Sequence, residues 1–204
     1  MSIARRLARQ LASPSGLSGR LLGNAMDMVN RKPLQLAVDL LAPRANEDVL
    51  DAGCGTGAAM AEIAARAPCR ITGIDRSETM IAAARRRLGS RARYSLSPID
   101  ALRSDDGTYD AVLALNVLYF ETPDHAMLRA LHRVLRPGGR IVAYATHRDS
   151  MRDWSFTREG LHRLFDAQDL RTAFVDAGFA QAQVDVHEVP VTRSVKGLLV
   201  RAWR

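Results

Sequence analysis

Residues 51–57 read DAGCGTG, so three glycines at alternate positions follow an acid. Glycine adopts backbone conformations that are closed to other residues and lets a ligand approach the main chain closely. Three kinds of ligand fit such a turn: a nucleoside triphosphate, a dinucleotide pyrophosphate and an adenosyl amino acid. Each implies a different chemistry, and the residues around the turn must distinguish them.

The residues after the turn exclude the triphosphate. A triphosphate loop needs a lysine followed by serine or threonine, whereas Gly57 is followed by two alanines. The dinucleotide fits better, because Gly53, Gly55 and Ala58 satisfy the G-x-G-x-x-A fingerprint. Asp75 also stands about where an acid that binds ribose hydroxyls is expected.

Asp51 distinguishes the two remaining ligands. It lies two residues before the first glycine, where its carboxylate would meet an incoming phosphate at short range, and like charges there cost affinity. An adenosyl amino acid carries an ammonium and, in the methyl donor, a sulfonium, so the same acid attracts it. Asp75 serves the ribose of either ligand, and Asp51 therefore favours the cationic one.

The elements that must position these residues follow from the hydrophobic pattern. From residue 44 onward apolar strands alternate with helices through short connections, which predicts an α/β fold with a doubly wound, mostly parallel sheet. Ligands of such sheets bind at the carboxyl ends of the strands. We expect strands over residues 48–53, 70–75, 92–97, 109–120 with the exit loop, and 140–146. We expect helices over 58–67, 77–89, 124–136 (ended by PGG) and 169–179, and a closing antiparallel hairpin over 180–204.

The sequence of residues 1–43 predicts a separate N-terminal helical cap. Within residues 3–11, isoleucine and leucines recur at helical spacing opposite three arginines, which indicates a short basic amphipathic helix. Such a helix either caps the site with a solvated arginine face or makes peripheral contact with an anionic membrane. A second helical stretch, residues 17–42, is expected to be interrupted at Pro33.

The net charge of +7 raises the question of a nucleic-acid partner. All basic residues except Lys32 and Lys196 are arginines scattered along the chain, which favours a solvated surface over a nucleic-acid patch. No apolar run is long enough to span a bilayer and no export signal is visible, so we expect a cytoplasmic protein, peripheral to the inner membrane face if residues 3–11 bind lipid. Cys54 and Cys69 have neither the number nor the spacing for a disulfide framework or a metal site.

Five motifs in order resemble those of the class I S-adenosylmethionine-dependent methyltransferases, in the branch that acts on small molecules. They are VLDAGCGTG, GIDRSETMI, PIDAL, YDAVLALNVLYF and LHRVLRPGGRIVAY, spread over residues 47–146. The order of five motifs is more specific than the glycine turn alone. The resemblance implies a Rossmann-like seven-stranded sheet with a C-terminal antiparallel hairpin, S-adenosylmethionine as the cofactor and S-adenosylhomocysteine as its product.

The resemblance also assigns residues to the cofactor. By this resemblance, Asp51, Gly53, Gly55 and Gly57 hold the methionine part, and Asp75 binds the ribose. Asp100 and Ala101 contact the adenine, and Arg76 and Met80 flank the adenosine. Asn116 lies beside the donor sulfur.

Methyl transfer depends mainly on alignment of nucleophile and methyl carbon, so a catalytic base is optional. The candidates are Tyr119, after the fourth strand, and His147, after the fifth; His132, within a helix, is expected to be structural. The fourth-strand exit reads NVLY, without the Asn/Asp-Pro-Pro-aromatic pattern of enzymes that methylate amino groups of bases or glutamine.

We therefore expect a small-molecule acceptor with an oxygen or nitrogen nucleophile. Its pocket is expected to lie under residues 1–43 and an insert at 148–166 of the methyltransferase domain, which spans residues 44–204. Met26, Met28, Trp154 and Phe156 would give it a lining suited to a lipophilic or aromatic molecule. Three alternatives stay open at this point: a phospholipid methyltransferase at the membrane, a nicotinamide-dependent oxidoreductase, and a non-catalytic module that only binds the cofactor.

Overall fold

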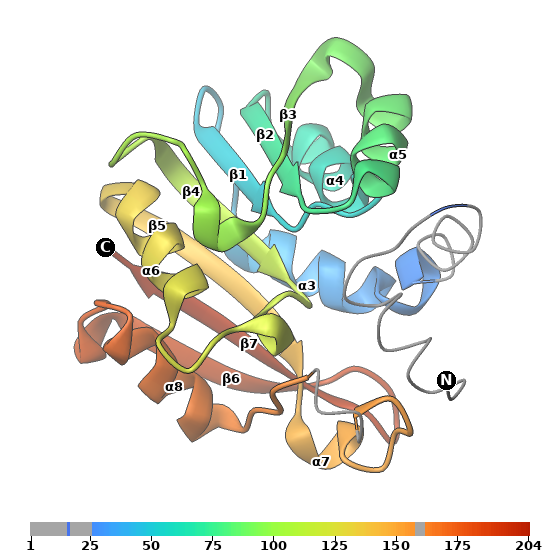
Figure 1. Cartoon of the computed structure of the whole chain (residues 1–204), viewed down its shortest axis with the longest axis vertical. Helices are drawn as coiled ribbons and strands as arrows, with labels where there is room; N and C mark the ends of the chain where they lie inside the picture. Colours follow the sequence, from blue (N-terminus) through green and yellow to red (C-terminus); the bar gives the residue numbers. More distant parts are fainter. Residues whose placement is uncertain (1–15, 17–25, 158–161) are drawn as a thin grey trace.

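The computed structural model describes residue 16 and residues 26–157 and 162–204 (Figure 1). The basic helix expected over residues 3–11, and with it the membrane contact, lies outside these residues. Within the described ranges, no helix combines the length and the apolar character needed to cross a bilayer.

Seven strands form one sheet in the order β3-β2-β1-β4-β5-β7-β6. The first five pair in parallel, and β7 lies antiparallel between β5 and β6. The strands are β1 (Asp48–Ala52), β2 (Arg70–Asp75), β3 (Ala92–Leu96), β4 (Tyr109–Leu115), β5 (Leu135–Thr146), β6 (Val184–Pro190) and β7 (Lys196–Trp203). The predicted doubly wound sheet and its terminal hairpin are confirmed, and the strand order reverses between β1 and β4, where such folds bind ligands.

Helices cover both faces of the sheet (Figure 1). One face packs against α3 (Arg31–Leu41), α4 (Ala58–Arg66) and α5 (Glu78–Leu88), and the other against α6 (Ala126–Val134) and α8 (Ala167–Asp176). Shorter segments complete the path: α7 (Arg148–Met151) and the 3₁₀ turns η1 (Gly89–Arg91), η2 (Ile99–Ala101), η3 (Leu118–Phe120) and η5 (Gln181–Gln183).

The central strands are apolar throughout because both of their faces are buried. In β4, Ala111 and Leu113 belong to the core under α3, α4 and α5, whereas Val112 and Ala114 belong to the core under α6 and α8. Side chains of a strand point alternately to its two faces, so burial on both sides removes any polar alternation.

The PGG sequence, predicted to end a helix, lies instead inside β5. Helix α6 ends at Val134, and β5 begins at Leu135. Gly138 has a φ of +78°, and a Cβ at Gly139 would lie 2.9 Å from the carbonyl oxygen of Arg136. The glycines thus allow an irregularity in the pairing of β4 with β5, which is the usual role of glycine at a bulge.

Pro33 does not interrupt the N-terminal helix. The break falls at Asn30, and Pro33 is the third residue of α3. The first turn of a helix has no intrahelical acceptors for its N–H groups, so a proline there removes no hydrogen bond.

Arg140 joins the end of α3 to the sheet. Its guanidinium donates to the carbonyl oxygens of Leu41 (2.6 Å) and Ala42 (2.9 Å), which lie at the end of α3. Its two terminal nitrogens also donate to the carboxylate of Glu47, each at 2.8 Å. The side chains of Arg140 and Glu47 are only 12% and 13% exposed, so this pair is shielded from water.

We expect Arg140→Met to lower the free energy of unfolding by about 3 kcal/mol, because it removes the cation that pairs with the shielded Glu47 carboxylate and leaves two carbonyl groups without their side-chain donor. The control is Arg66→Met, which removes an exposed arginine paired with Asp39 and Glu62 and should cost less than about 1 kcal/mol. Urea unfolding of both variants measures the difference, and equal costs would contradict the prediction.

Candidate active site

The glycine turn connects β1 to α4 and has a fixed shape. Gly53, Gly55 and Gly57 all have positive φ, at 77°, 52° and 79°. The N–H groups of Gly53 and Cys54 both donate to the carbonyl oxygen of Ile74, at 2.8 and 2.9 Å, which ties the turn to β2. A Cβ at Gly53 would lie 2.2 Å from Val117, so only glycine fits where the turn passes the exit of β4.

Asp75, the last residue of β2, has a carboxylate held by the backbone. One oxygen accepts from the N–H of Gly55 at 2.9 Å, and the other accepts from the N–H of Ser77 at 2.8 Å. Burial raises the pKa of Asp75, while the two backbone donors oppose that rise. Both oxygens keep a further lone pair, so the carboxylate is oriented and can still accept from a ligand.

Asp51, the fourth residue of β1, lacks the backbone donors that hold Asp75. Its side chain is buried, and its Oδ2 atom has no hydrogen-bond partner within the described part of the chain. Burial, with the nearby charge of Asp75 as a second cause, raises the pKa of Asp51 from its ordinary 3.8 to about 7. A buried carboxylate without a donor is costly to ionise, and a cation beside it would remove that cost.

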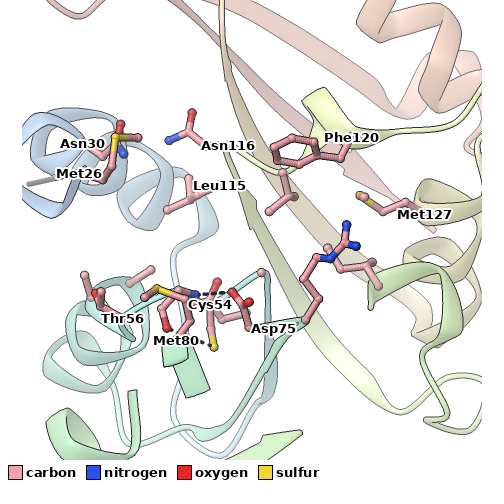
Figure 2. Close-up of a pocket in the computed structure, with 18 of the residues that line it drawn as sticks. Met26, Asn30, Cys54, Thr56, Asp75, Met80, Leu115, Asn116, Phe120 and Met127 are labelled. Atoms are coloured by element: carbon pink, nitrogen blue, oxygen red, sulfur yellow. Dashed lines mark hydrogen bonds between the residues drawn. The ribbon is translucent and has the colours of Figure 1, made fainter. Parts of the chain in front are cut away.

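A cavity of about 280 Å³ lies over these residues (Figure 2). Its lining comes from the glycine turn, from the ends of β2 and β4, from the turn at residues 98–100 and from the N-terminal segment. The residues that the N-terminal segment contributes are Met26, Asp27, Asn30, Pro33 and Leu34.

The N-terminal segment is fastened to the glycine turn by a three-residue cluster. The Thr56 hydroxyl lies 2.7 and 2.8 Å from the two carboxylate oxygens of Asp27. Arg87 from α5 donates to both residues, at 3.1 Å to Thr56 and 2.8 Å to Asp27. One wall of the cavity is thereby held against the glycine turn.

Most residues that the sequence assigns to a cofactor meet in this cavity. Those that line it are Asp51, Gly53, Gly55, Asp75, Arg76, Met80, Asp100 and Asn116. Gly57 and Ala101 do not. Gly57 precedes the first residue of α4, and a Cβ at Gly57 would lie 3.0 Å from the Cβ of Ala84, so this glycine serves helix packing. Ala101 is an exposed residue at the end of the turn η2.

Tyr119, a predicted base, lies behind the cavity wall and not on it. Its hydroxyl accepts from the N–H of Thr146 at 2.6 Å and donates to Oδ1 of Asn116 at 3.0 Å. Burial raises the pKa of this phenol further above its ordinary value of 10.0. Tyr119 therefore holds Asn116 and is poorly suited to take a proton.

His147, the other predicted base, does not line the cavity either. It precedes α7, and its Nδ1 accepts from the N–H of Asp149 at 3.1 Å, as a capping group does. Its Nε2 lies 3.6 Å from the carboxylate of Glu188 on β6. These contacts give His147 a structural role in this arrangement.

Sequence reasoning missed the side of the cavity that faces the glycine turn. Beyond Met26, it did not single out Asn30, Leu115, Phe120, Glu121 or Met127, all of which line it. The carboxylate of Glu121 accepts from three backbone N–H groups, two of them at the start of α6, which is the pattern of a helix cap. An acid just before a helix reads as such a cap in the sequence, so its place in the cavity wall gave no separate signal.

The aromatic residues expected over the pocket lie elsewhere. Trp154 packs against Phe156, which packs in turn against His162, and none of the described residues of the 148–166 insert lines the cavity. Met28 is 78% exposed.

Comparison with known proteins agrees with this geometry. Residues 49–139 match the family described as a methyltransferase domain. The ubiquinone biosynthesis O-methyltransferase of Methylocella silvestris is 37% identical over 127 residues, which cover 60% of this chain and 49% of that protein. The demethylmenaquinone methyltransferase of Thermus thermophilus is 36% identical over 138 residues, which cover 65% and 61%. Residues 49–139 therefore carry a methyltransferase domain, and the chain is similar to class I S-adenosylmethionine-dependent methyltransferases.

The fold of the chain is also similar to that of a solved methyltransferase. The structure of the Burkholderia thailandensis 1,6-didemethyltoxoflavin-N1-methyltransferase matches with a TM-score of 0.71 and 22% identity, over 100% of this chain and 91% of that one. At this identity the likeness concerns the fold alone. The chain spans between 49% and 61% of the length of the first curated relatives it matches.

The residues present fit the cofactor of this methyltransferase family. The Asp51 carboxylate, with its unpartnered oxygen, matches a positively charged amino acid part, and the oriented Asp75 carboxylate matches ribose hydroxyls. At Gly55, beside them, a Cβ would meet no described atom within 4 Å, so the backbone faces open space there. A dinucleotide would instead bring phosphates towards two buried acids.

The raised pKa of Asp51 predicts how stability depends on pH. The folded protein keeps this proton up to about pH 7, whereas the unfolded chain loses it near pH 3.8, so raising the pH through this interval lowers the free energy of unfolding. Asp51→Asn removes the titration. We expect the variant to gain stability relative to the wild type by up to about 4 kcal/mol between about pH 4 and pH 8.

Denaturant unfolding of the ligand-free proteins across this pH range measures the effect. Asp39→Asn, which replaces an exposed acid, is the control and should track the wild type. A constant difference between wild type and Asp51→Asn at all pH values would show that Asp51 ionises normally.

Proposed function

We propose that the protein transfers the methyl group of S-adenosylmethionine to a small-molecule acceptor with an oxygen or nitrogen nucleophile. The observation that carries this proposal is the buried Asp51 carboxylate, whose Oδ2 has no partner among the described residues, in the wall of a cavity formed by the glycine turn. Such a group is stabilised by a cationic ligand and destabilised by an anionic one.

When bound, S-adenosylmethionine supplies an electrophilic methyl group on a positively charged sulfur. We infer that Asp51 balances the charge of the amino acid part, that Asp75 accepts from the ribose hydroxyls and that Met80 packs against the adenosine. Apolar side chains of Leu115, Phe120 and Met127 line the remaining part of the cavity, where they would exclude water and align the acceptor. No described residue has to act as a base for this function.

An apolar acceptor is supported by the same lining. Met26 lines the cavity from the N-terminal segment, and Phe120 and Met127 follow β4 (Figure 2). Leu34, in α3, also lines it. The names of the matched relatives refer to ubiquinone biosynthesis, demethylmenaquinone and 1,6-didemethyltoxoflavin, and this agrees with an aromatic or lipophilic small molecule. We treat residues 1–43 as a cap on a methyltransferase domain of residues 44–204. Membrane contact would depend on residues 3–11 of that cap.

The nicotinamide alternative is disfavoured by charge. Two pyrophosphate charges would meet Asp51, Asp75 and Asp100 in the cavity wall, while Arg76 is the one cation among the described lining residues. The adenosine part, which both cofactors share, does not distinguish them, so the acids decide against the dinucleotide.

We expect the purified protein to bind S-adenosylhomocysteine in calorimetric titrations and to give no heat with NAD or NADP. Asp75→Asn should weaken this binding about tenfold or more, because its amide nitrogen cannot replace a carboxylate acceptor for a ribose hydroxyl. The exposed Asp39→Asn should bind as the wild type does. Dinucleotide binding without binding of S-adenosylhomocysteine would contradict the proposal.

Turnover separates an enzyme from a module that only binds the cofactor. We expect methyl-labelled S-adenosylmethionine to transfer its label to an organic-solvent extract of aromatic metabolites, and Asp51→Asn to abolish this transfer. Cofactor binding with no transfer to any polar or apolar extract would favour the non-catalytic alternative.

A further inference from the structure

The helical turn of residues 26–29, which we call the wall turn, has little contact with the core. Met26 and the residue that follows the turn, Asn30, border the cavity (Figure 2). Met28 and Val29 are 78% and 71% exposed. The next helix, α3, differs from the wall turn, because it buries one face against the sheet. The wall turn is therefore free to move while α3 stays in place.

Asn30 separates the wall turn from α3. Its φ of −89° and ψ of 5° depart from helical values, and the chain forms a turn there. Pro33 has no N–H, so it cannot donate to the carbonyl oxygen of Val29, four residues earlier. The helical hydrogen-bond ladder is thus weakened where the wall turn joins α3. Kinks and hinges of helices form at such places.

Asp27 holds the wall turn against the glycine turn. Within the described residues, all side-chain hydrogen bonds of the wall turn come from its carboxylate, which accepts from the Thr56 hydroxyl and the Arg87 guanidinium. We call these three residues the latch. The side chains of Asp27 and Arg87 are 26% and 34% exposed, and partly exposed ion pairs of this kind contribute modestly and break readily.

The cavity beside the wall turn is small for its proposed contents. Its volume is about 280 Å³. Sites that hold one small ligand measure about 300 to 1,000 Å³, and the proposed function requires a cofactor and an acceptor together. Asp51, which the cofactor must reach, is only 1% exposed. The glycine turn is tied to β2 by backbone hydrogen bonds, whereas the wall turn depends on the latch, so the wall turn is the side that gives way.

We propose that the wall turn is a gate that swings about Asn30. The latch of Asp27, Thr56 and Arg87 holds the gate shut in the ligand-free protein, and the cofactor binds with the latch open. The inference rests on the proposed function and adds to it a control of cofactor entry. Because only the open fraction of the protein binds, the latch lowers both the association rate and the apparent affinity for the cofactor.

The test measures the rates of S-adenosylhomocysteine binding to the full chain by surface plasmon resonance. We expect Arg87→Met to raise the association rate constant about fivefold and to lower Kd by the same factor, at an unchanged dissociation rate constant, because more of the protein is open before the ligand arrives. Arg87 does not line the cavity, so this change removes no ligand contact. A wall that merely supports the bound ligand would give the opposite pattern, with faster dissociation and unchanged association.

Two further variants accompany Arg87→Met. The matched control is Arg86→Met, which removes the neighbouring exposed arginine of α5 and should keep the wild-type rates. Arg87→Lys keeps a positive charge but loses the second hydrogen bond, so its association rate should lie between those of the wild type and Arg87→Met. Circular dichroism verifies that each variant is folded.

Movement of the wall turn is measured directly with a fluorine label on Met28→Cys. This site is exposed, Cys54 is buried, and Cys69→Ser removes the other thiol. We expect the ¹⁹F resonance to shift when S-adenosylhomocysteine saturates the protein. In the ligand-free Arg87→Met protein, it should already lie closer to the saturated position.

Two results would overturn the inference. One is an unchanged association rate constant in folded Arg87→Met. The other is a ¹⁹F resonance that stays in place when S-adenosylhomocysteine saturates the wild-type latch, a measurement that needs no latch variant. Failure of the wild type to bind S-adenosylhomocysteine in calorimetry would instead count against the proposed function, so the two failures are distinguishable.

Discussion

Two buried acids at the ends of neighbouring strands, Asp51 and Asp75, are the constraint on which this site depends. Like charges at short range in a shielded position repel each other, and the described part of the protein satisfies only one of them with its own donors. The backbone N–H of Gly55 donates to the carboxylate of Asp75, which requires the glycine turn to pass over the end of β2. Asp51 keeps an oxygen without such a donor, and its pKa is raised, which is the feature on which the proposed cationic ligand rests.

The side of the cavity formed by the glycine turn could be predicted from sequence because its geometry is local. An acid, three glycines and the next strand end lie within 25 residues, and the alternation of apolar strands with helices brings them to one edge of the sheet. The predictions of secondary structure were wrong where one local sequence pattern is compatible with two structures. The glycines after Pro137 resemble a helix stop, but only the neighbouring strand β4 shows that they form an irregularity within β5.

The opposite side of the cavity could not be predicted because it depends on which atoms are already paired. Tyr119 and His147 stand at strand exits, as catalytic residues often do, yet one holds Asn116 and the other caps α7. Asn30 and Asn116 line one cavity although 86 positions separate them in the chain. No spacing rule connects such residues, since their proximity arises from the packing of the N-terminal segment against the completed sheet.

The position of β7 has a consequence for how the chain folds. β7 follows β6 in sequence but lies between β5 and β6, so β6 cannot join the sheet until residues 196–203 have been synthesised. Until then the long strand β5 has an unpaired edge of exposed backbone groups, which other chains can join. If the first five strands pair before β7 is available, the edge of an apolar strand is therefore open to aggregation at that stage.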